Sequence, residues 1–293
     1  MANASNYCPY NSTSSTYDLA RRPLDIDDLI TRIETLAASR RCAVSDLKLL
    51  DIGAGSGNYY AELRKRGCMI QYHGLEGSQG MIDQFSAKEA AKDESARGIF
   101  SLQLCDLTKL PLSLDNETFD VCMITQVIHH LSDGKDDHCH IYNLNKELGR
   151  VITANGGFMW LQTSAPEQQD GFWWSAIIPI ASAKLSPRFP PNDKLIDNLS
   201  NVCGFDTVVT HIPDDPLMSK EMYLDYEGAF KEEWRNCDST WALNTSEELE
   251  QGLAELRILI DNGSVNKFME DRETRRNNIG QTTTVVATKA LKV

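Results

Sequence analysis

The sequence predicts a doubly wound α/β fold around a seven-stranded, mostly parallel sheet with helices on both faces. Short apolar runs alternate with segments of helical periodicity from residue 47 to residue 163, and a glycine-rich turn follows the first run. Strands joined in this way pair in parallel through right-handed crossovers. The run 121–124 does not alternate with polar residues, as expected for a strand that is covered on both faces.

The elements follow in order. An amphipathic helix is expected at 24–38, ahead of the core. The pattern then predicts strands at 47–52, 69–76, 99–105, 119–126 and 158–163, with helices ending near residue 66 and spanning 80–91 and 141–152. Further along, it predicts a loop-rich cap at 168–191, a helix at 193–203, strands at 205–212 and 282–289, and a long insertion at 214–280.

The insertion contains one convincing helix, at 246–260, because Thr245 or Ser246 followed by Glu247 and Glu248 is typical of a helix N-cap. The chain is therefore divided into an N-terminal arm and lid helix, a core, a cap loop with continuation of the sheet, a lid insertion and a final strand of the core. Their ranges are 1–45, 46–165, 166–213, 214–280 and 281–293.

Composition narrows the class of partner. The 293 residues carry a formal net charge of -13, and such a surface repels phosphate backbones and anionic lipid headgroups. We expect no nucleic-acid or membrane partner. The basic clusters at 21–22 and 272–276 are interpreted as solvated faces or small-anion clamps.

No signal segment or long apolar run is visible, so a cytoplasmic protein is expected. The eight cysteines include no C-x-x-C pair, so we expect reduced thiols and no metal site. A monomer and a homodimer are both compatible with the sequence.

The motif Asp51-Ile52-Gly53-Ala54-Gly55-Ser56-Gly57 follows the first strand, where doubly wound sheets bind ligands. Glycines there let the backbone approach a ligand closely. Glu76 ends the second predicted strand, 19 residues beyond Gly57, as expected for a carboxylate that accepts hydrogen bonds from two ribose hydroxyls.

Over residues 47–163 the chain resembles the class I S-adenosylmethionine-dependent methyltransferases, which have a Rossmann-like fold and a D-x-G-x-G-x-G motif. The resemblance implies that S-adenosyl-L-methionine (SAM) is bound and S-adenosyl-L-homocysteine (SAH) released. It implies that the glycine turn, with Asp51 beneath it, holds the methionine moiety. The remaining implied cofactor contacts are Glu76 to ribose, Asp106 to the adenine amino group, Met81 and Leu107 to the adenine plane, and Gln126 to the methionine side.

Three other classes of protein are considered as alternatives. Rossmann dehydrogenases also place an acid after the second strand, but their G-x-G-x-x-G fingerprint differs from the G-x-G-x-G found here, and Cys105-Asp106-Leu107 has no counterpart in them. An aminopropyltransferase would need carboxylates where this chain has Gln126, His129 and His130. A non-catalytic protein that retains the fold is the third alternative. Ala154 and Asn155 depart from the Leu-Arg/Lys-Pro usual before the family's Gly-Gly pair, without touching a cofactor position.

The acceptor site is expected beside the carboxyl edge of the sheet. Aromatic residues outside the sheet either form an apolar pocket for the acceptor or fix a loop-rich lid to the core. Arg22 or Arg235 could clamp a carboxylate, although Arg235 and Asp238 could instead form a structural pair. The candidate acceptor-binding residues are Tyr17, Arg22, Trp173, Trp174, Tyr223, Trp234, Arg235, Asp238 and Trp241.

His129 and His130 follow the fourth strand, and either could act as a base, with Gln126 beside them; one could instead hydrogen-bond a backbone carbonyl. The sequence predicts a small-molecule methyltransferase. Its acceptor could be a carboxylate-bearing thioether of the 4-methylthio-2-hydroxybutyrate type, S-methylated as in the dimethylsulfoniopropionate (DMSP) route. N- and O-methylation of a small metabolite are the alternatives.

Overall fold

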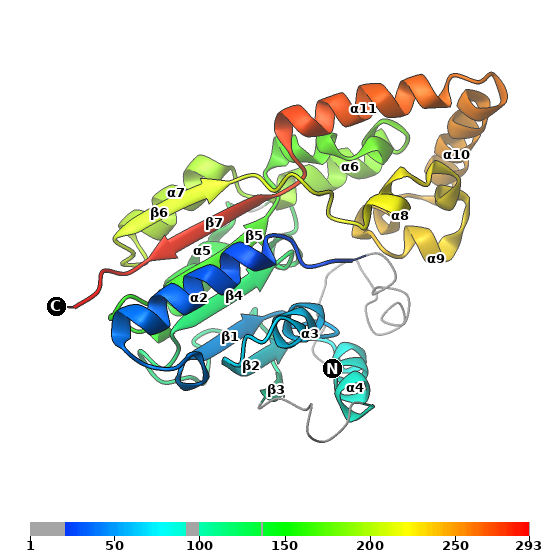
Figure 1. Ribbon diagram of the computed structural model, residues 1–293. Coiled ribbons are helices and arrows are strands. Elements are labelled where there is room, and N and C mark those ends of the chain that lie inside the picture. Colours follow the sequence, from blue (N-terminus) through cyan, green and yellow to red (C-terminus); the bar gives the residue numbers. More distant parts are fainter. Residues whose placement is uncertain (1–20, 92–99, 136, 293) are drawn as a thin grey trace.

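The computed structural model describes residues 21–91, 100–135 and 137–292. Its centre is a single seven-stranded sheet in the order β3-β2-β1-β4-β5-β7-β6 (Figure 1). All neighbouring strands pair in parallel except β7, which is antiparallel to both β5 and β6. This confirms the predicted fold class. The strands are β1 (Lys48–Ile52), β2 (Gln71–Glu76), β3 (Phe100–Leu104), β4 (Val121–Thr125), β5 (Phe158–Thr163), β6 (Thr207–His211) and β7 (Thr283–Thr288).

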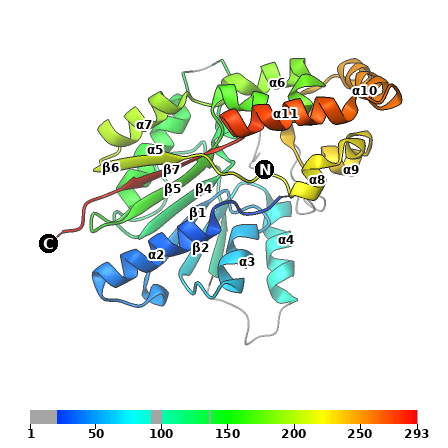
Figure 2. The same ribbon diagram turned by 45° about the horizontal axis from the view of Figure 1, so that its top comes forward.

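Helices cover both faces of the sheet (Figure 2). On one face α5 (Cys139–Val151) and α7 (Asn192–Asn201) contribute to an apolar cluster that receives Leu50 and Ile52 of β1. On the other face Leu49 joins the apolar residues of three further helices, because successive side chains of a strand point to opposite faces. These are α2 (Ile26–Arg40), α3 (Asn58–Lys65) and α4 (Gln79–Ala90).

The helical stripe of α5 shows how the sequence determines these layers. Ile141, Leu144, Leu148 and Val151 recur at three- and four-residue spacing, and all are fully buried. Burying one such aliphatic side chain contributes about 1.5–3 kcal/mol, so this face alone is sufficient to dock the helix. Asn143 and Lys146 between them are exposed, whereas Asn145 is buried and donates a hydrogen bond to Asn198 of α7.

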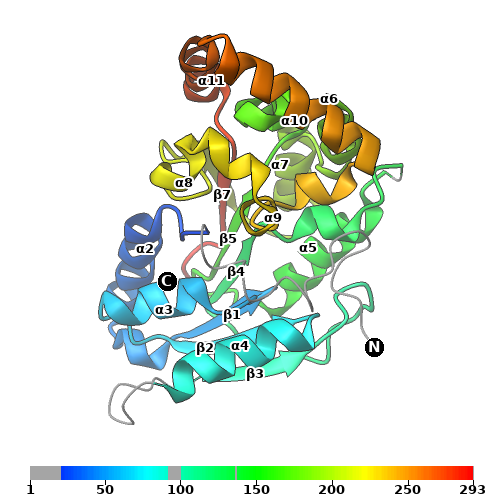
Figure 3. The same cartoon turned by 90° about the vertical axis from the view of Figure 1, so that its right-hand side faces the viewer.

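Residues 166–189 and 214–280 pack together over one end of the sheet, and we call this unit the cap (Figure 3). Its first part follows the carboxyl end of β5, and its second part lies between the end of β6 and the start of the antiparallel β7. The ends of β5 and β6 and the start of β7 all lie at the carboxyl edge of the parallel strands. The cap helices are α6 (Pro179–Leu185), α8 (Lys220–Leu224), α9 (Glu232–Arg235), α10 (Ser246–Asp261) and α11 (Val265–Ile279).

The cap is more regular than the sequence predicts. The segment expected as a loop contains α6 and several 3-10 turns, because its apolar residues are buried against the rest of the cap rather than against the sheet. The expected N-cap of α10 is confirmed: Thr245 and Glu248 form a reciprocal capping box. Helix α11 was not predicted, since its buried residues are only Val265, Met269 and Arg276 and most of the others are polar.

None of the helices in the described ranges is both long and apolar enough to cross a membrane.

Candidate functional site

The glycine motif forms a turn directly after β1, on the boundary with β4 where the strand order reverses. Gly53, Gly55 and Gly57 have φ values of 73°, 55° and 83°, all in the left-handed region that favours glycine. At Gly53 a Cβ would lie 2.3 Å from Val127 Cγ2, so a side chain has no room there. The turn therefore brings bare backbone against the end of β4.

Asp51 lies beneath this turn and is 2% exposed. The pKa of its carboxyl is raised to about 7, mainly by burial and to a smaller extent by the charge of Glu76, while a hydrogen bond from the Tyr72 hydroxyl opposes the rise. Its Oδ1 has no hydrogen-bond partner in the described part of the chain. The site thus contains a carboxyl group that changes its charge near neutral pH.

Glu76 ends β2 and holds the glycine turn in place. One carboxylate oxygen accepts a hydrogen bond from the Gly55 amide at 2.8 Å, and the other accepts one from the Ser78 amide at 2.8 Å. Burial raises the pKa of Glu76, while these backbone donors lower it. Each carboxylate oxygen keeps a further lone pair for a ligand hydroxyl. The sequence predicted only a ligand role for Glu76, but the structure gives it a second role in shaping the turn.

Asp106 lies two residues beyond the end of β3, next to the carboxyl end of β2. It accepts hydrogen bonds from the Thr108 hydroxyl at 2.6 Å and from the Thr108 amide at 3.1 Å, and the first of these is the main cause of its lowered pKa. Met81, in the first turn of α4, and Leu107 are buried. A charged carboxylate and two apolar side chains therefore lie near the ends of β2 and β3.

A pocket opens over the glycine turn, with about 490 Å³ of empty space that is partly open to solvent. Of the residues predicted from the sequence, Gly53, Gly55, Gln126 and Arg22 line it. Gln126 has a left-handed backbone with φ of 57°, and its buried Nε2 has no hydrogen-bond partner within the described residues. An unpaired buried amide costs about 1–3 kcal/mol, which is a reason to expect a polar ligand here.

The pocket also contains residues that the sequence did not single out. Tyr59 follows the glycine turn, and its hydroxyl donates to Gln162 Oε1 at 2.6 Å and accepts from the Leu24 amide at 3.0 Å. Gln162, in β5, also donates to the Thr284 hydroxyl at 3.0 Å. A polar residue inside an otherwise apolar buried strand was the sequence signal for Gln162. These bonds fix one wall of the pocket.

His129 and His130 lie in a 3-10 turn, η3 (Ile128–Leu131), after β4. Both are buried, with ring centroids 4.0 Å apart. Burial lowers the pKa of His130 to about 3, helped by the charges of Arg188 and Arg21, and the pKa of His129 also lies well below its usual range. Both rings are neutral at pH 7, and a base of such low pKa removes protons poorly.

The described residues do not form the expected aromatic pocket for the acceptor. The five candidate aromatic residues of the cap are 0–5% exposed and contact one another, with centroid separations such as 5.6 Å between Trp174 and Trp234. Trp173 donates its indole N–H to Tyr223 O at 2.7 Å. The interpretation of these rings as walls of an open pocket is corrected: Trp173, Trp174, Tyr223, Trp234 and Trp241 are the interior of the cap. Tyr17 lies outside the described residues.

The pair between Arg235 and Asp238, given as the alternative to a carboxylate clamp, is not formed. Arg235 donates to the Ala229 carbonyl at 2.8 Å, inside the cap. Asp238 instead accepts from Arg21 Nη2 at 3.1 Å, and Arg21 lines the pocket. Arg235 therefore does not stand where a carboxylate clamp was expected. Arg21, which the sequence analysis treated only as part of a basic cluster, lines the pocket together with the predicted Arg22.

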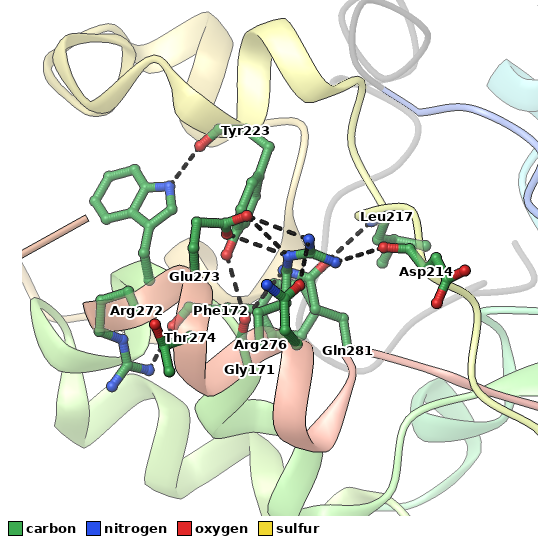
Figure 4. Close-up of polar contacts among 12 residues, drawn as sticks. Gly171, Phe172, Asp214, Leu217, Tyr223, Arg272, Glu273, Thr274, Arg276 and Gln281 are labelled. Atoms are coloured by element: carbon green, nitrogen blue, oxygen red, sulfur yellow. Dashed lines mark hydrogen bonds and ion pairs between the residues drawn. The ribbon is translucent and has the colours of Figure 1, made fainter. Parts of the chain in front are cut away.

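The second basic cluster, on α11, fastens that helix to the cap (Figure 4). Arg272 and Arg275 pair with Asp170 at 2.9 and 2.7 Å. Arg276 pairs with Glu273 at 3.1 Å and donates to the Asp214 carbonyl at 2.6 Å. These guanidiniums are engaged by the chain itself, so this cluster is neither a solvated face nor an anion clamp.

No group of side chains suited to holding a metal ion occurs in the ranges that the structure describes.

Comparisons with known proteins agree with this geometry. Residues 50–159 match the family model described as a methyltransferase domain. The human methyltransferase-like protein 27 is 34% identical over 116 residues, which cover 39% of this chain and 40% of the human protein.

Among solved structures, a putative methyltransferase from an antibiotic biosynthesis pathway of Anabaena variabilis aligns with a TM-score of 0.63 and 21% identity, covering 91% of this chain and 98% of its own. The plantazolicin methyltransferase aligns with a TM-score of 0.51 and 11% identity, covering 95% of this chain and 90% of its own.

The sheet order and the glycine turn at its switch point define a Rossmann-like α/β protein. Residues 50–159 are a methyltransferase domain, and the sheet that contains them has the fold of the class I S-adenosylmethionine-dependent methyltransferases.

Proposed function

We propose that this protein transfers a methyl group from SAM to a small-molecule acceptor at the carboxyl edge of the sheet. The observation that carries the proposal is the left-handed glycine turn, held by Glu76 against the end of β4. SAM, when bound, supplies a methyl group made electrophilic by the sulfonium sulfur. The plantazolicin methyltransferase, which shares the fold, was solved with SAH, and this supports the choice of donor.

The residues present fit SAM. A Cβ on Gly55 would meet no atom closer than 3.9 Å, so the turn faces open space. We assign the turn, Asp51 and Gln126 to the methionine end, because Asp51 Oδ1 and Gln126 Nε2 are a buried acceptor and donor without partners among the described residues. Glu76 is assigned to the ribose hydroxyls because lone pairs remain on its carboxylate.

The adenine end is assigned to the region after β3. Asp106, kept ionised by its hydrogen bonds to Thr108, would accept from the adenine amino group. Met81 and Leu107 supply buried apolar surface for the two faces of the ring. Arg22, which lines the pocket over the glycine turn, is kept as a candidate acceptor contact.

The histidines favour an acceptor that needs no base. His130, with a pKa of about 3, binds a proton weakly at neutral pH. A thioether attacks with a sulfur lone pair and releases no proton, which supports S-methylation of a carboxylate-bearing thioether of the 4-methylthio-2-hydroxybutyrate type. Under this proposal His129 and His130 shape and desolvate the site rather than remove a proton.

Two measurements test the proposal. Isothermal titration of the purified protein with SAM and SAH should give micromolar or tighter dissociation constants. Incubation with SAM and 4-methylthio-2-hydroxybutyrate should then give a sulfonium product by mass spectrometry. Absence of SAM and SAH binding by folded protein would refute methyl transfer. Binding with methylation only of amine or phenol acceptors would replace the thioether with N- or O-methylation.

A further inference from the structure

A row of polar side chains crosses the sheet beside the pocket. Gln162 of β5 is the register partner of Thr284 of β7, which is in turn the register partner of His211 of β6. Side chains that lie opposite one another on neighbouring strands project from the same face of the sheet. Gln162 and Thr284 are 1% and 0% exposed. Because buried polar groups are usually hydrogen-bonded, the partners of this row show what it holds in place.

The hydrogen bonds of the row run in one direction, toward Asp25, which immediately precedes α2. The Thr284 hydroxyl donates to Asp25 Oδ2 at 2.9 Å, and His211 Nε2 donates to the same oxygen at 2.8 Å. A hydroxyl has a single hydrogen. Since Thr284 uses it toward Asp25, the Thr284 oxygen is the acceptor of the bond from Gln162 Nε2 at 3.0 Å.

The orientation of the Gln162 amide determines that of the Tyr59 hydroxyl. The amide nitrogen also lies 3.4 Å from the Leu24 carbonyl, which can only accept. The amide oxygen is therefore the end that faces Tyr59, and it accepts the hydroxyl hydrogen at 2.6 Å. The second acceptor within reach of that hydrogen is the Leu24 carbonyl, at 3.4 Å. In both cases the chain itself takes the hydrogen, so a ligand group that binds the Tyr59 oxygen has to donate one.

This chain of hydrogen bonds also has a polarity. Every hydrogen in it points toward the Asp25 carboxylate, and hydrogen bonds arranged in this way polarise one another. The opposite end, the Tyr59 oxygen, is therefore the negative end. Tyr59 and Gln162 both line the pocket over the glycine turn. A positively charged hydrogen-bond donor is the ligand group that complements this wall.

We propose that Tyr59 accepts a hydrogen bond from the ammonium group of SAM, and that Gln162 and Thr284 are positioning residues that hold its hydroxyl in this role. The inference rests on the proposed methyl transfer. The ammonium is the cationic hydrogen-bond donor at the methionine end of SAM. The carboxylate at the same end can only accept, so it suits Gln126 Nε2, a donor in the same pocket.

Two arginines also line this pocket, and neither is at odds with a cationic ligand group. Arg21 is paired with Asp238, which offsets its charge. Arg22 is exposed to solvent, which screens its charge. The Tyr59 wall therefore remains the part of the pocket suited to the ammonium.

The test compares two ligands, SAH and the SAH analogue that lacks only the amino group. SAH has the same methionine end as SAM. In isothermal titration the wild-type protein should bind SAH about tenfold more tightly than the analogue, or more, and a tenfold difference is equivalent to about 1.4 kcal/mol. Tyr59→Phe removes only the hydroxyl. It should therefore abolish most of this preference by weakening the binding of SAH, with the affinity for the analogue unchanged.

Variants of β7 test the positioning role. Thr284→Val keeps the shape of the side chain and interrupts the hydrogen bonds between Gln162 and Asp25, so it should reduce the preference for SAH at least about threefold. Thr284→Ser retains a hydroxyl and should restore the preference. Thr283→Val is the matched control, because Thr283 is also buried but points to the opposite face, where its hydroxyl donates to Gln168 at 3.0 Å. It should leave the preference intact.

Equal affinities of the wild-type protein for SAH and the analogue would overturn the proposal, and that comparison needs no variant. Retention of the full preference by Tyr59→Phe, or equal weakening of both ligands, would overturn the assignment of Tyr59. Equal preferences in Thr284→Val and Thr283→Val would remove the positioning role. Failure of the wild-type protein to bind SAM and SAH at all would instead refute the proposed methyl transfer, so the failures are distinguishable.

Discussion

The Arg21 guanidinium lies 3.1 Å from the Asp238 carboxylate, across 217 positions of sequence. Both side chains are largely buried, with 12% and 7% exposure. An antiparallel bridge between Arg21 and Met218 reinforces the contact. Together they join the segment ahead of α2 to the cap beside the pocket, so the cap and the sheet are coupled where the acceptor is proposed to bind.

Asp238→Asn should therefore destabilise the protein by roughly 2–4 kcal/mol, since it removes the charge of one member of a largely buried ion pair. A double-mutant cycle with Arg21→Met, followed by urea unfolding, measures the coupling. We expect it to exceed about 1 kcal/mol. The exposed pair Lys267–Asp271 is the control and should give at most about 0.5 kcal/mol. Equal coupling in the two pairs would contradict this view of the junction.

Gly55→Ala should mainly weaken cofactor binding, whereas Gly53→Ala should cause the larger loss of stability. At Gly55 an added Cβ meets no atom nearer than 3.9 Å, so the substitution costs only the strain of a left-handed alanine, about 1 kcal/mol. Because Gly55 faces the pocket, SAM affinity should fall at least about tenfold. At Gly53 the Cβ lies 2.3 Å from Val127, so stability should fall more, by about 2–4 kcal/mol.

Thermal unfolding and SAM titration of both variants provide the measurement. If Gly55→Ala bound SAM as tightly as the wild type, the glycine turn would not be in contact with the cofactor.

Glu76→Gln should weaken SAM binding at least tenfold, about 1.4 kcal/mol or more. The substituted amide retains only one acceptor oxygen, whereas Glu76 accepts from both the Gly55 and Ser78 amides. Glu62→Gln is a matched control on the outer side of α3, where Glu62 pairs with Arg66. Equal SAM affinities in the two variants, measured by titration calorimetry, would remove Glu76 from the cofactor site.

Ionisation of the Asp51 carboxyl should lower the free energy of unfolding as the pH rises through neutrality. Its folded pKa, raised from 3.8 to about 7 by burial, lies above the unfolded value, so the folded state binds the proton more tightly. The stabilisation is complete below pH 4 and is lost as pH rises through 7, and a shift of about three units corresponds to about 4 kcal/mol.

The free energy of unfolding of the wild type and of Asp51→Asn is measured in urea at several pH values. The difference between the two proteins at each pH gives the contribution of Asp51. Asp51→Asn should gain stability relative to wild type between pH 5 and pH 8. A difference independent of pH would show that Asp51 is not the titrating group. Tyr72→Phe should move the transition to higher pH, since the Tyr72 hydroxyl stabilises the ionised carboxylate.

The sequence alone predicted the sheet and located the glycine turn that is proposed to bind the cofactor. Strand 158–163 was predicted at its observed bounds, and the glycine turn, Glu76 and Asp106 were located because they follow strands in sequence. Such features depend on local periodicity and on chain order, which fix the carboxyl edge once the strands are parallel.

The tertiary structure decided the cap and the partners of its side chains. The aromatic residues that resembled a pocket are its interior, and Asp238 pairs with Arg21 rather than with the nearby Arg235. The local sequence pattern indicates that a tryptophan is buried, but it does not indicate which residues surround it. Nor does it predict which charged residues pair when they lie far apart in the chain. Long-range packing, which brings Arg188 to the end of η3 and buries His129 and His130, determines the lowered pKa values of these histidines.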